Sequence, residues 1–267
     1  MSRASALVDA MGVLHTPVDP QSAVRIVSLV PSITELLCDL GLTPWLVART
    51  GFCIHPAGAV AAIPKIGGTK DVNVNKIRQL RPTHLIVNID ENEKPTVDAL
   101  AAFVPHIIVT HPLTPQDNLT LYALLGGIFN AEAAAEKLAS QLNAELAFTR
   151  AQAHMPQRVL YCIWQDPWMT VARDTYIAAM LGLIGWQHWQ APGDKRYPPF
   201  DWTPALLDAV DIVLLSSEPY HFTQQHADAL EKQIGKPTRL VDGEMLSWYG
   251  SRAIAGLRYV RTLSAEG

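Results

Sequence analysis

Several features that would place a chain in a familiar class are scarce in this sequence. It has only three cysteines, Cys38, Cys53 and Cys162, which lie far apart and form no CxxC motif. This scarcity argues against a disulfide framework or a structural zinc site. Charged residues make up only 17% of the 267 residues, and the formal net charge is -4. Because basic residues form no patch, we do not expect nucleic acid as a partner.

Long apolar runs and catalytic signatures are also missing. The longest apolar stretches have the length of a β-strand, far short of the roughly 20 residues that span a bilayer. Residues 1–21 contain no apolar run that could act as a secretion signal, so export is not indicated and a cytoplasmic location stays open. No GxSxG, HExxH or GxGxxG motif occurs. The sequence therefore favours a protein that is not an enzyme.

The sequence does contain a regular alternation of strands and helices. Such an alternation predicts an α/β fold with parallel sheets. Strands rich in apolar and β-branched residues are predicted at 25–30, 44–49, 84–87, 107–110, 158–164, 212–216 and 238–241. Helix starts are predicted from capping residues, namely Ser32 with Glu35, Asn73, Thr114 before Pro115, Asp174, and Thr203 before Pro204.

One long helix separates the two alternating halves. From Asn130 to about Met155 there is no glycine or proline, and Leu138, Leu142 and Leu146 recur every four residues. A helix of about 25 residues is roughly 37 Å long, which is more than one small lobe needs. We therefore predict two lobes joined by a backbone helix, with a small ligand in the cleft between them. The predicted boundaries are 1–127, 128–156 and 157–267.

Loops that follow strands are the expected positions of ligand-binding residues, because ligands of parallel α/β sheets bind beyond the carboxyl ends of the strands. Large aromatic rings gather near several predicted strand ends, where they would suit stacking on a flat or macrocyclic ligand. The candidate ligand-binding residues are Cys53, His55, Asp90, Glu91, Trp164, Trp168, Tyr197, Glu218, Tyr220 and Trp248.

Cys53 and His55 also raise the alternative of a bare divalent metal ion. They are two residues apart in an extended loop, a spacing that can place both side chains on one side of the chain. His111 and a carboxylate, Asp90 or Glu91, would complete such a site. Cys53 and His55 alone are insufficient, so no metal ligands are assigned.

The order of these motifs resembles the helical-backbone (class III) periplasmic binding proteins, and within them the cobalamin-binding branch. The similarity covers nearly the whole chain. It is carried by the segments RIVSLVPSITELL, IGGTKDVNVNKIRQLRPTHLIV, WMTVARDTYIAAMLGLIG and YPPFDWTPALLDAVDIVLLSSEPY, which follow in the family order. The first of these, together with RPTHLIV, is fairly specific for the fold and says little about the ligand.

The resemblance implies a monomeric substrate receptor of an ABC transporter that needs no cofactor and captures cobalamin or a similar corrinoid or chelated-metal ligand. The alternatives are a receptor for a divalent metal, a siderophore or haem, and a cytosolic enzyme that handles a corrinoid or metallocofactor. In cobalamin receptors of this group aromatic residues sandwich the corrin ring. Tyr197 matches one such position approximately, and Trp248 lies three residues from another, at Met245.

The resemblance also concerns a membrane partner. In transport members one glutamate on each lobe docks onto arginines of the permease. The matching positions in this chain are Asn75 and Thr203, so both docking carboxylates are replaced. Docking would then depend on other carboxylates, such as Asp71 or Asp201.

Overall fold

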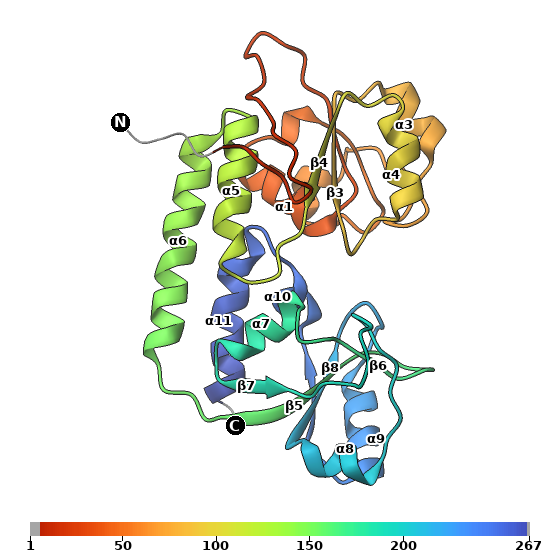
Figure 1. Cartoon of the computed structure of the whole chain (residues 1–267), viewed down its shortest axis with the longest axis vertical. Helices are drawn as coiled ribbons and strands as arrows, with labels where there is room; N and C mark the ends of the chain where they lie inside the picture. Colours follow the sequence, from red (N-terminus) through yellow and green to blue (C-terminus); the bar gives the residue numbers. More distant parts are fainter. Residues whose placement is uncertain (1–5, 266–267) are drawn as a thin grey trace. The chain divides into compact units, whose positions relative to one another are not determined.

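A computed structural model describes residues 6–265, which form two compact units (Figure 1). The N-terminal unit takes its described residues from Met1–Pro112, Gln116–Leu142 and Tyr249–Arg252. The C-terminal unit takes its own from Leu113–Pro115, Asn143–Trp248 and Ala253–Gly267. No helix within the described part of the chain combines the length and the apolar character needed to cross a membrane.

The N-terminal unit is built on a four-stranded sheet. Its elements are β1 (Ile26–Ser28), α1 (Pro31–Asp39), β2 (Leu46–Arg49), α2 (Ala57–Val60), α3 (Val74–Leu80), β3 (His84–Asn88), α4 (Lys94–Ala101), β4 (His106–Thr110) and α5 (Asp117–Ile128), with a 3-10 turn at Thr43–Trp45. The strands are all parallel, in the order β2-β1-β3-β4. Leu85 and Val87 pack in one core cluster with Ile77 of α3 and Leu100 of α4. Figure 1 shows α3 and α4 on one side of this sheet.

The C-terminal unit contains a five-stranded sheet. Its elements are β5 (Gln157–Trp164), β6 (Met169–Thr170), α7 (Tyr176–Gly182), β7 (Trp186–His188), α8 (Pro204–Ala209), β8 (Ile212–Ser216), α9 (Gln224–Ile234), β9 (Thr238–Val241), α10 (Gly243–Ser247) and α11 (Arg252–Ala265). The order is β6-β5-β8-β9, and β7 also pairs with β5. All pairs are parallel except β5 with β6. The predicted α/β fold with parallel sheets is confirmed, whereas β6 and β7 were not predicted.

Helix α6 (Glu132–Ala151) is the predicted long helix, with 20 residues instead of about 25. Leu138, Leu142 and Leu146 are buried, so the leucines spaced by four form its apolar face. The helix ends earlier than predicted because the chain turns at Gln152, whose N–H donates to the carbonyl of Thr149, only three residues back. One part of α6 belongs to the N-terminal unit and the rest to the C-terminal unit.

Two of the predicted helix starts are confirmed by their hydrogen bonds. The side chain of Asn73 accepts from the N–H of Lys76 at 2.9 Å, and α3 begins at the next residue. Thr203 accepts from the N–H of Leu206 at 3.2 Å, directly before Pro204. Both caps satisfy a backbone donor that has no partner within the helix.

The other three predicted starts are wrong. Helix α1 begins at Pro31 with Val30 before it, so Ser32 lies inside the first turn, and Glu35 binds Arg252 instead of capping the helix. Proline at the first helical position sets this start, because its φ is already helical. Helix α5 begins only at Asp117, after the predicted Thr114 and Pro115. Helix α7 is capped by Thr175, one residue beyond Asp174.

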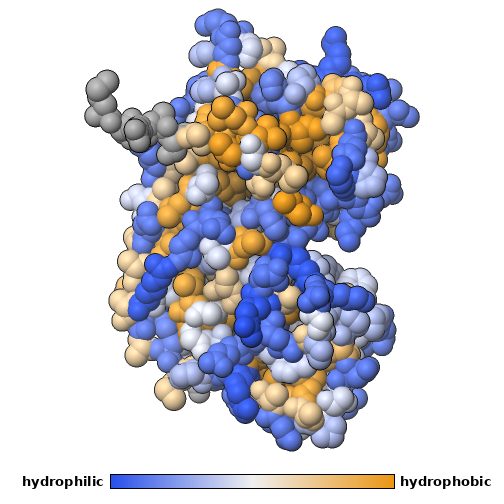
Figure 2. All heavy atoms as spheres, viewed as in Figure 1, coloured by the Kyte–Doolittle hydropathy of each residue, from blue (hydrophilic) through white to orange (hydrophobic). Residues whose placement is uncertain are grey.

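A buried carboxylate attaches the N-terminal segment to edge strand β4. Asp9, only 6% exposed, accepts hydrogen bonds from the N–H groups of Met11, Val13 and Val109 at 2.9 to 3.0 Å. It also contacts His15 Nε2 at 3.2 Å. Apolar side chains of this segment, including Val8, Met11 and Leu14, are exposed, and Figure 2 shows apolar residues gathered on a face of the N-terminal unit.

Replacing Asp9 with alanine is therefore expected to lower the free energy of unfolding by about 3 kcal/mol, because several buried donors lose a charged acceptor. Asp19→Ala is the matched control, since Asp19 is exposed and accepts a local bond from Gln21 N–H. That control should change stability by less than about 1 kcal/mol. Urea unfolding followed by circular dichroism measures both. Equal effects of the two substitutions would show that Asp9 does not hold the segment.

Candidate functional site

The carboxyl ends of the parallel strands lie at one edge of each sheet, and loops extend from there. In the N-terminal unit the turn after β3 is held by its own amides. Asn92 Oδ1 accepts from the N–H of Asn88 at 2.9 Å, and its Nδ2 donates to the carbonyl of Thr69 at 2.9 Å. Asn88 Oδ1 in turn accepts from the N–H of Asp90 at 2.8 Å. These bonds give the two predicted carboxylates, Asp90 and Glu91, defined positions.

Each of these two carboxylates has a specific partner. Asp90 Oδ2 lies 3.2 Å from His111 Nε2, in the loop after the neighbouring strand β4, and both side chains are about one-fifth exposed. Glu91 Oε1 accepts from the phenol of Tyr249 at 2.5 Å. Burial and the nearby Glu91 raise the pKa of Tyr249, so the phenol keeps its proton and remains a donor. The structure thus brings Asp90, Glu91 and His111 together at one edge of the sheet.

Three apolar side chains at the same edge were missed by the sequence analysis. Phe52 is 63% exposed, Ile54 is 48% exposed, and Ile89 is 44% exposed. The ring of Phe52 lies over Gly68, where a β-carbon in place of the glycine hydrogen would be 3.4 Å from its Cε2 atom. Apolar residues directly after predicted strands could have indicated a binding surface in the sequence, because apolar side chains exposed to water do not stabilise a loop. They give this edge an apolar surface beside the carboxylates.

Cys53 and His55, from the loop after β2, do not form the proposed metal site. Cys53 is fully buried, with its Sγ 3.1 Å from Thr50 Oγ1, and burial raises the pKa of the thiol. His111 is engaged with Asp90. Within residues 6–265 no three His, Cys, Asp or Glu side chains are grouped so as to hold a metal ion. The alternative of a bare metal held by Cys53, His55, His111 and a carboxylate is therefore wrong for this structure. His55 itself is partly exposed.

In the C-terminal unit, Trp164, the last residue of β5, pairs with Tyr220 from the loop after β8. Trp164 is 40% exposed, and its ring meets that of Tyr220 edge-on with centroids 5.3 Å apart. Tyr197, from the long loop after β7, is 37% exposed. Trp164 and Tyr197 present surface that a ligand could contact. Tyr220 and Trp168 are partly buried and pack against the core cluster, where Trp168 stacks on Phe222 with a centroid distance of 5.8 Å.

Glu218 and Trp248 are joined directly. Trp248 Nε1 donates to Glu218 Oε1 at 2.7 Å, and the hydroxyl of Ser247 donates to the same oxygen at 2.9 Å. Burial raises the pKa of Glu218, although the two donors oppose that shift. Trp248 is only 8% exposed, so it acts here as a hydrogen-bond donor that orients a carboxylate.

Comparisons with known proteins support the resemblance seen in the sequence. Residues 26–236 match the family described as Periplasmic binding protein. The Vitamin B12-binding protein of Vibrio cholerae is 25% identical over 214 residues, which cover 79% of this chain and 74% of that protein. The crystal structure of the periplasmic vitamin B12 binding protein BtuF of Vibrio cholerae matches with a TM-score of 0.75, at 20% identity, over 91% of this chain and 96% of that one.

A haem-binding protein is structurally just as similar. The crystal structure of the periplasmic heme binding protein HutB of Vibrio cholerae also gives a TM-score of 0.75, at 23% identity, over 91% of this chain and 99% of that one. At these identities the solved structures establish the fold, and they do not distinguish vitamin B12 from haem as the ligand of this chain.

Trp248→Phe is expected to lower the free energy of unfolding by roughly 2 kcal/mol, because the partly buried carboxylate of Glu218 loses a donor while the ring volume is largely kept. Trp164→Phe is the matched control, since that indole is exposed, and it should cost less than about 1 kcal/mol. Chemical unfolding at pH 7 measures both. If Trp248→Phe were as mild as the control, the bond to Glu218 would not contribute to stability.

Proposed function

Because the chain belongs to the periplasmic binding protein family, we propose that it is a receptor that captures cobalamin or a closely related corrinoid. Membership in a family of binding proteins agrees with the expectation that the chain is not an enzyme. Relatives named Vitamin B12-binding protein, at 23 to 27% identity, support cobalamin. The similar haem-binding structure makes haem the competing ligand.

The charge of the strand-end loops is the observation that favours a corrinoid over haem. The segments at 50–56, 89–93, 111–116, 165–168, 217–220 and 242–248, the last of which includes α10, contain no lysine or arginine. They do contain seven carboxylates, which are Asp90, Glu91, Glu93, Asp166, Glu218, Asp242 and Glu244. The propionates of haem are anions that such loops would repel, whereas the neutral carboxamides of a corrinoid can donate N–H groups to carboxylates.

Two other segments near these strand ends do carry basic residues. Segment 67–71, which the ring of Phe52 overlies at Gly68, has Lys70 beside Asp71. The loop after β7 has Lys195 and Arg196 beside Asp194 and Asp201, and Arg196 donates to Asp174 at 2.9 Å. The charges of each segment balance, so neither adds net positive charge for an acidic ligand.

Apolar and aromatic side chains supply the other half of the proposed recognition. Phe52, Ile54 and Ile89 are exposed on the N-terminal unit, and Trp164 is exposed on the C-terminal unit beside the partly buried Tyr220. Large rings and branched side chains suit contact with the flat face of a macrocycle. Each set is defined within its own unit and can be tested by itself.

We also propose that the receptor delivers its ligand to an ABC transporter permease. The two positions that match the docking glutamates are exposed but uncharged: Asn75 lies in the first turn of α3, and Thr203 caps α8. Exposed carboxylates are close in sequence at Asp71 and Asp201. A permease partner would therefore have to recognise these two aspartates rather than glutamates at the helix starts.

Calorimetric titration with cyanocobalamin tests the ligand directly. One molecule is expected to bind per chain in the micromolar range or tighter, which corresponds to about -8 kcal/mol or better. Haemin under the same conditions should bind at least tenfold more weakly. Tighter binding of haemin would reject the charge argument and leave haem as the ligand.

The aromatic contacts are tested by single substitutions. Phe52→Ala and Trp164→Ala should each weaken cyanocobalamin binding about tenfold or more and leave the melting temperature within a few degrees, because both side chains are exposed. Phe148→Ala is the control, since Phe148 is 55% exposed on α6, under the guanidinium of Arg261. Unchanged affinity in both test variants would mean that the ligand binds elsewhere.

A further inference from the structure

A pocket lies in the N-terminal unit at the amino ends of its strands, whereas the candidate ligand loops follow the carboxyl ends. It has a volume of about 330 Å³. His84 and His106, which line it, are the first residues of β3 and β4 and are partners in the strand register. The pocket therefore sits at the amino ends of these strands. All residues that line the pocket belong to the N-terminal unit.

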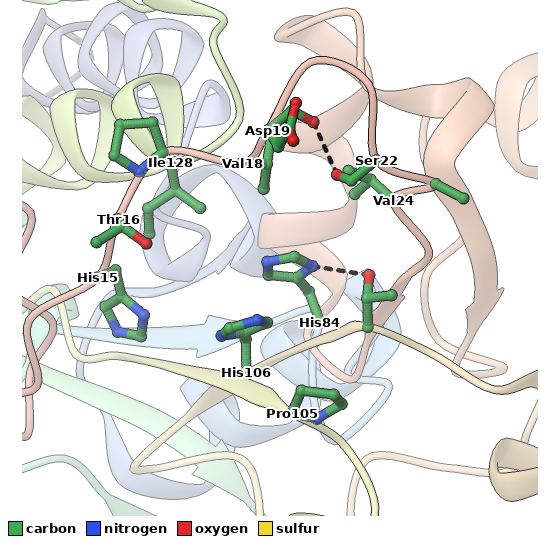
Figure 3. Close-up of a pocket in the computed structure, with 13 residues that line it drawn as sticks. His15, Thr16, Val18, Asp19, Ser22, Val24, His84, Pro105, His106 and Ile128 are labelled. Atoms are coloured by element: carbon green, nitrogen blue, oxygen red, sulfur yellow. Dashed lines mark hydrogen bonds between the residues drawn. The ribbon is translucent and has the colours of Figure 1, made fainter.

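Three imidazoles converge on this pocket from three separate segments (Figure 3). The rings of His84 and His106 are stacked, with centroids 4.7 Å apart and planes inclined by 21°. His84 Nδ1 is 2.8 Å from the hydroxyl of Thr83, and His15 Nε2 is 3.2 Å from Asp9 Oδ2. The remaining walls are largely apolar, as Figure 3 shows for Val18 and Ile128.

Positive charge on His84 is disfavoured in this pocket. Burial, and after it the neighbouring His106 and His15, lower the pKa of His84 to about 4. The lining contains no lysine or arginine, and Asp19 is its one carboxylate. Asp19 is exposed and already accepts from the N–H of Gln21, while Asp9 stands behind His15. Among the described residues, no carboxylate therefore lies directly against the ring of His84 to balance a proton there.

The arrangement does not suit a metal ion. Stacked rings face each other through their planes, whereas ligands of one ion must point ring nitrogens at a common centre. In the part of the chain that the structure describes, these histidines do not form a group that could hold a metal. An anion, by contrast, would supply the missing counter-charge, and an apolar body would fill the space beside Val18, Val24 and Ile128.

We propose that this pocket binds a small carboxylate with an apolar body, together with one proton taken up by His84. The carboxylate pairs with the protonated imidazole of His84, and the stacked ring of His106 spreads the charge through a cation–π contact. His84 is only 7% exposed, so water screens this ion pair little, which strengthens it. The site is separate from the proposed corrinoid site and does not rest on that function.

Calorimetric titration of the full chain with benzoate tests this proposal. Binding is expected at pH 5, with one proton taken up per benzoate when buffers of different ionisation enthalpy are compared. Its affinity should fall about tenfold per pH unit between pH 5 and 6.5, because His84, whose pKa is lowered to about 4 in the free protein, must first gain a proton. In NMR titrations the pKa of His84 should rise when benzoate is present. Cyanocobalamin binding should be unaffected by benzoate.

His84→Phe provides the decisive variant, because it keeps a flat ring against His106 but cannot carry the proton. His84 is buried, so the variant is first checked for an unchanged circular dichroism spectrum and a cooperative unfolding transition. Benzoate binding at pH 5 should weaken at least tenfold in this variant and stay unchanged in His221→Phe, which alters an exposed histidine of the C-terminal unit. No binding at 10 mM benzoate by the unsubstituted chain, binding without proton uptake, or equal binding by a folded His84→Phe would overturn the proposal.

Discussion

Carboxylates that accept hydrogen bonds from buried or partly buried donors hold the segments on which the rest of this structure depends. Such a group is costly to remove from water unless donors replace the lost hydration. Asp9 meets this condition with three backbone N–H groups, and Glu218 meets it with Ser247 and Trp248. In each case the carboxylate joins parts of the chain that no regular secondary structure would connect.

The segment Tyr249–Arg252 shows how far this principle extends. It follows α10 in the sequence, yet it belongs to the N-terminal unit. Tyr249 donates to Glu91, and Arg252 donates twice to Glu35 at 2.7 and 2.8 Å. Between them, the N–H of Gly250 donates to Asn118 Oδ1 at 2.6 Å. Glu91, one of the carboxylates in the proposed ligand loops, is therefore oriented by a residue from near the C-terminal end of the chain.

Sequence patterns predicted what is determined locally and missed what is determined at long range. The strand at Ile212–Ser216 and the cap at Thr203 were predicted because each depends on neighbouring residues. The short strand β7 was missed because Trp186–His188 is defined by its pairing with β5 rather than by composition. Proposed contacts such as Glu91 and Glu218 were found as polar residues after strands. Trp248, the partner of Glu218, was also named, but as a ligand contact, and the partner of Glu91 was missed because Tyr249 lies 158 residues from it in sequence.

The hydrogen bond from Val109 to Asp9 also affects whether a second molecule could add a strand beside β4. Strand β4 is the last strand of its sheet, and an open edge is a template for adding a strand from a second molecule. At Val109 both outward backbone groups are already used, because its N–H donates to Asp9 and its carbonyl accepts from Ala10. The N-terminal segment thus covers β4 at Val109, where a strand from a second molecule would need these same backbone groups.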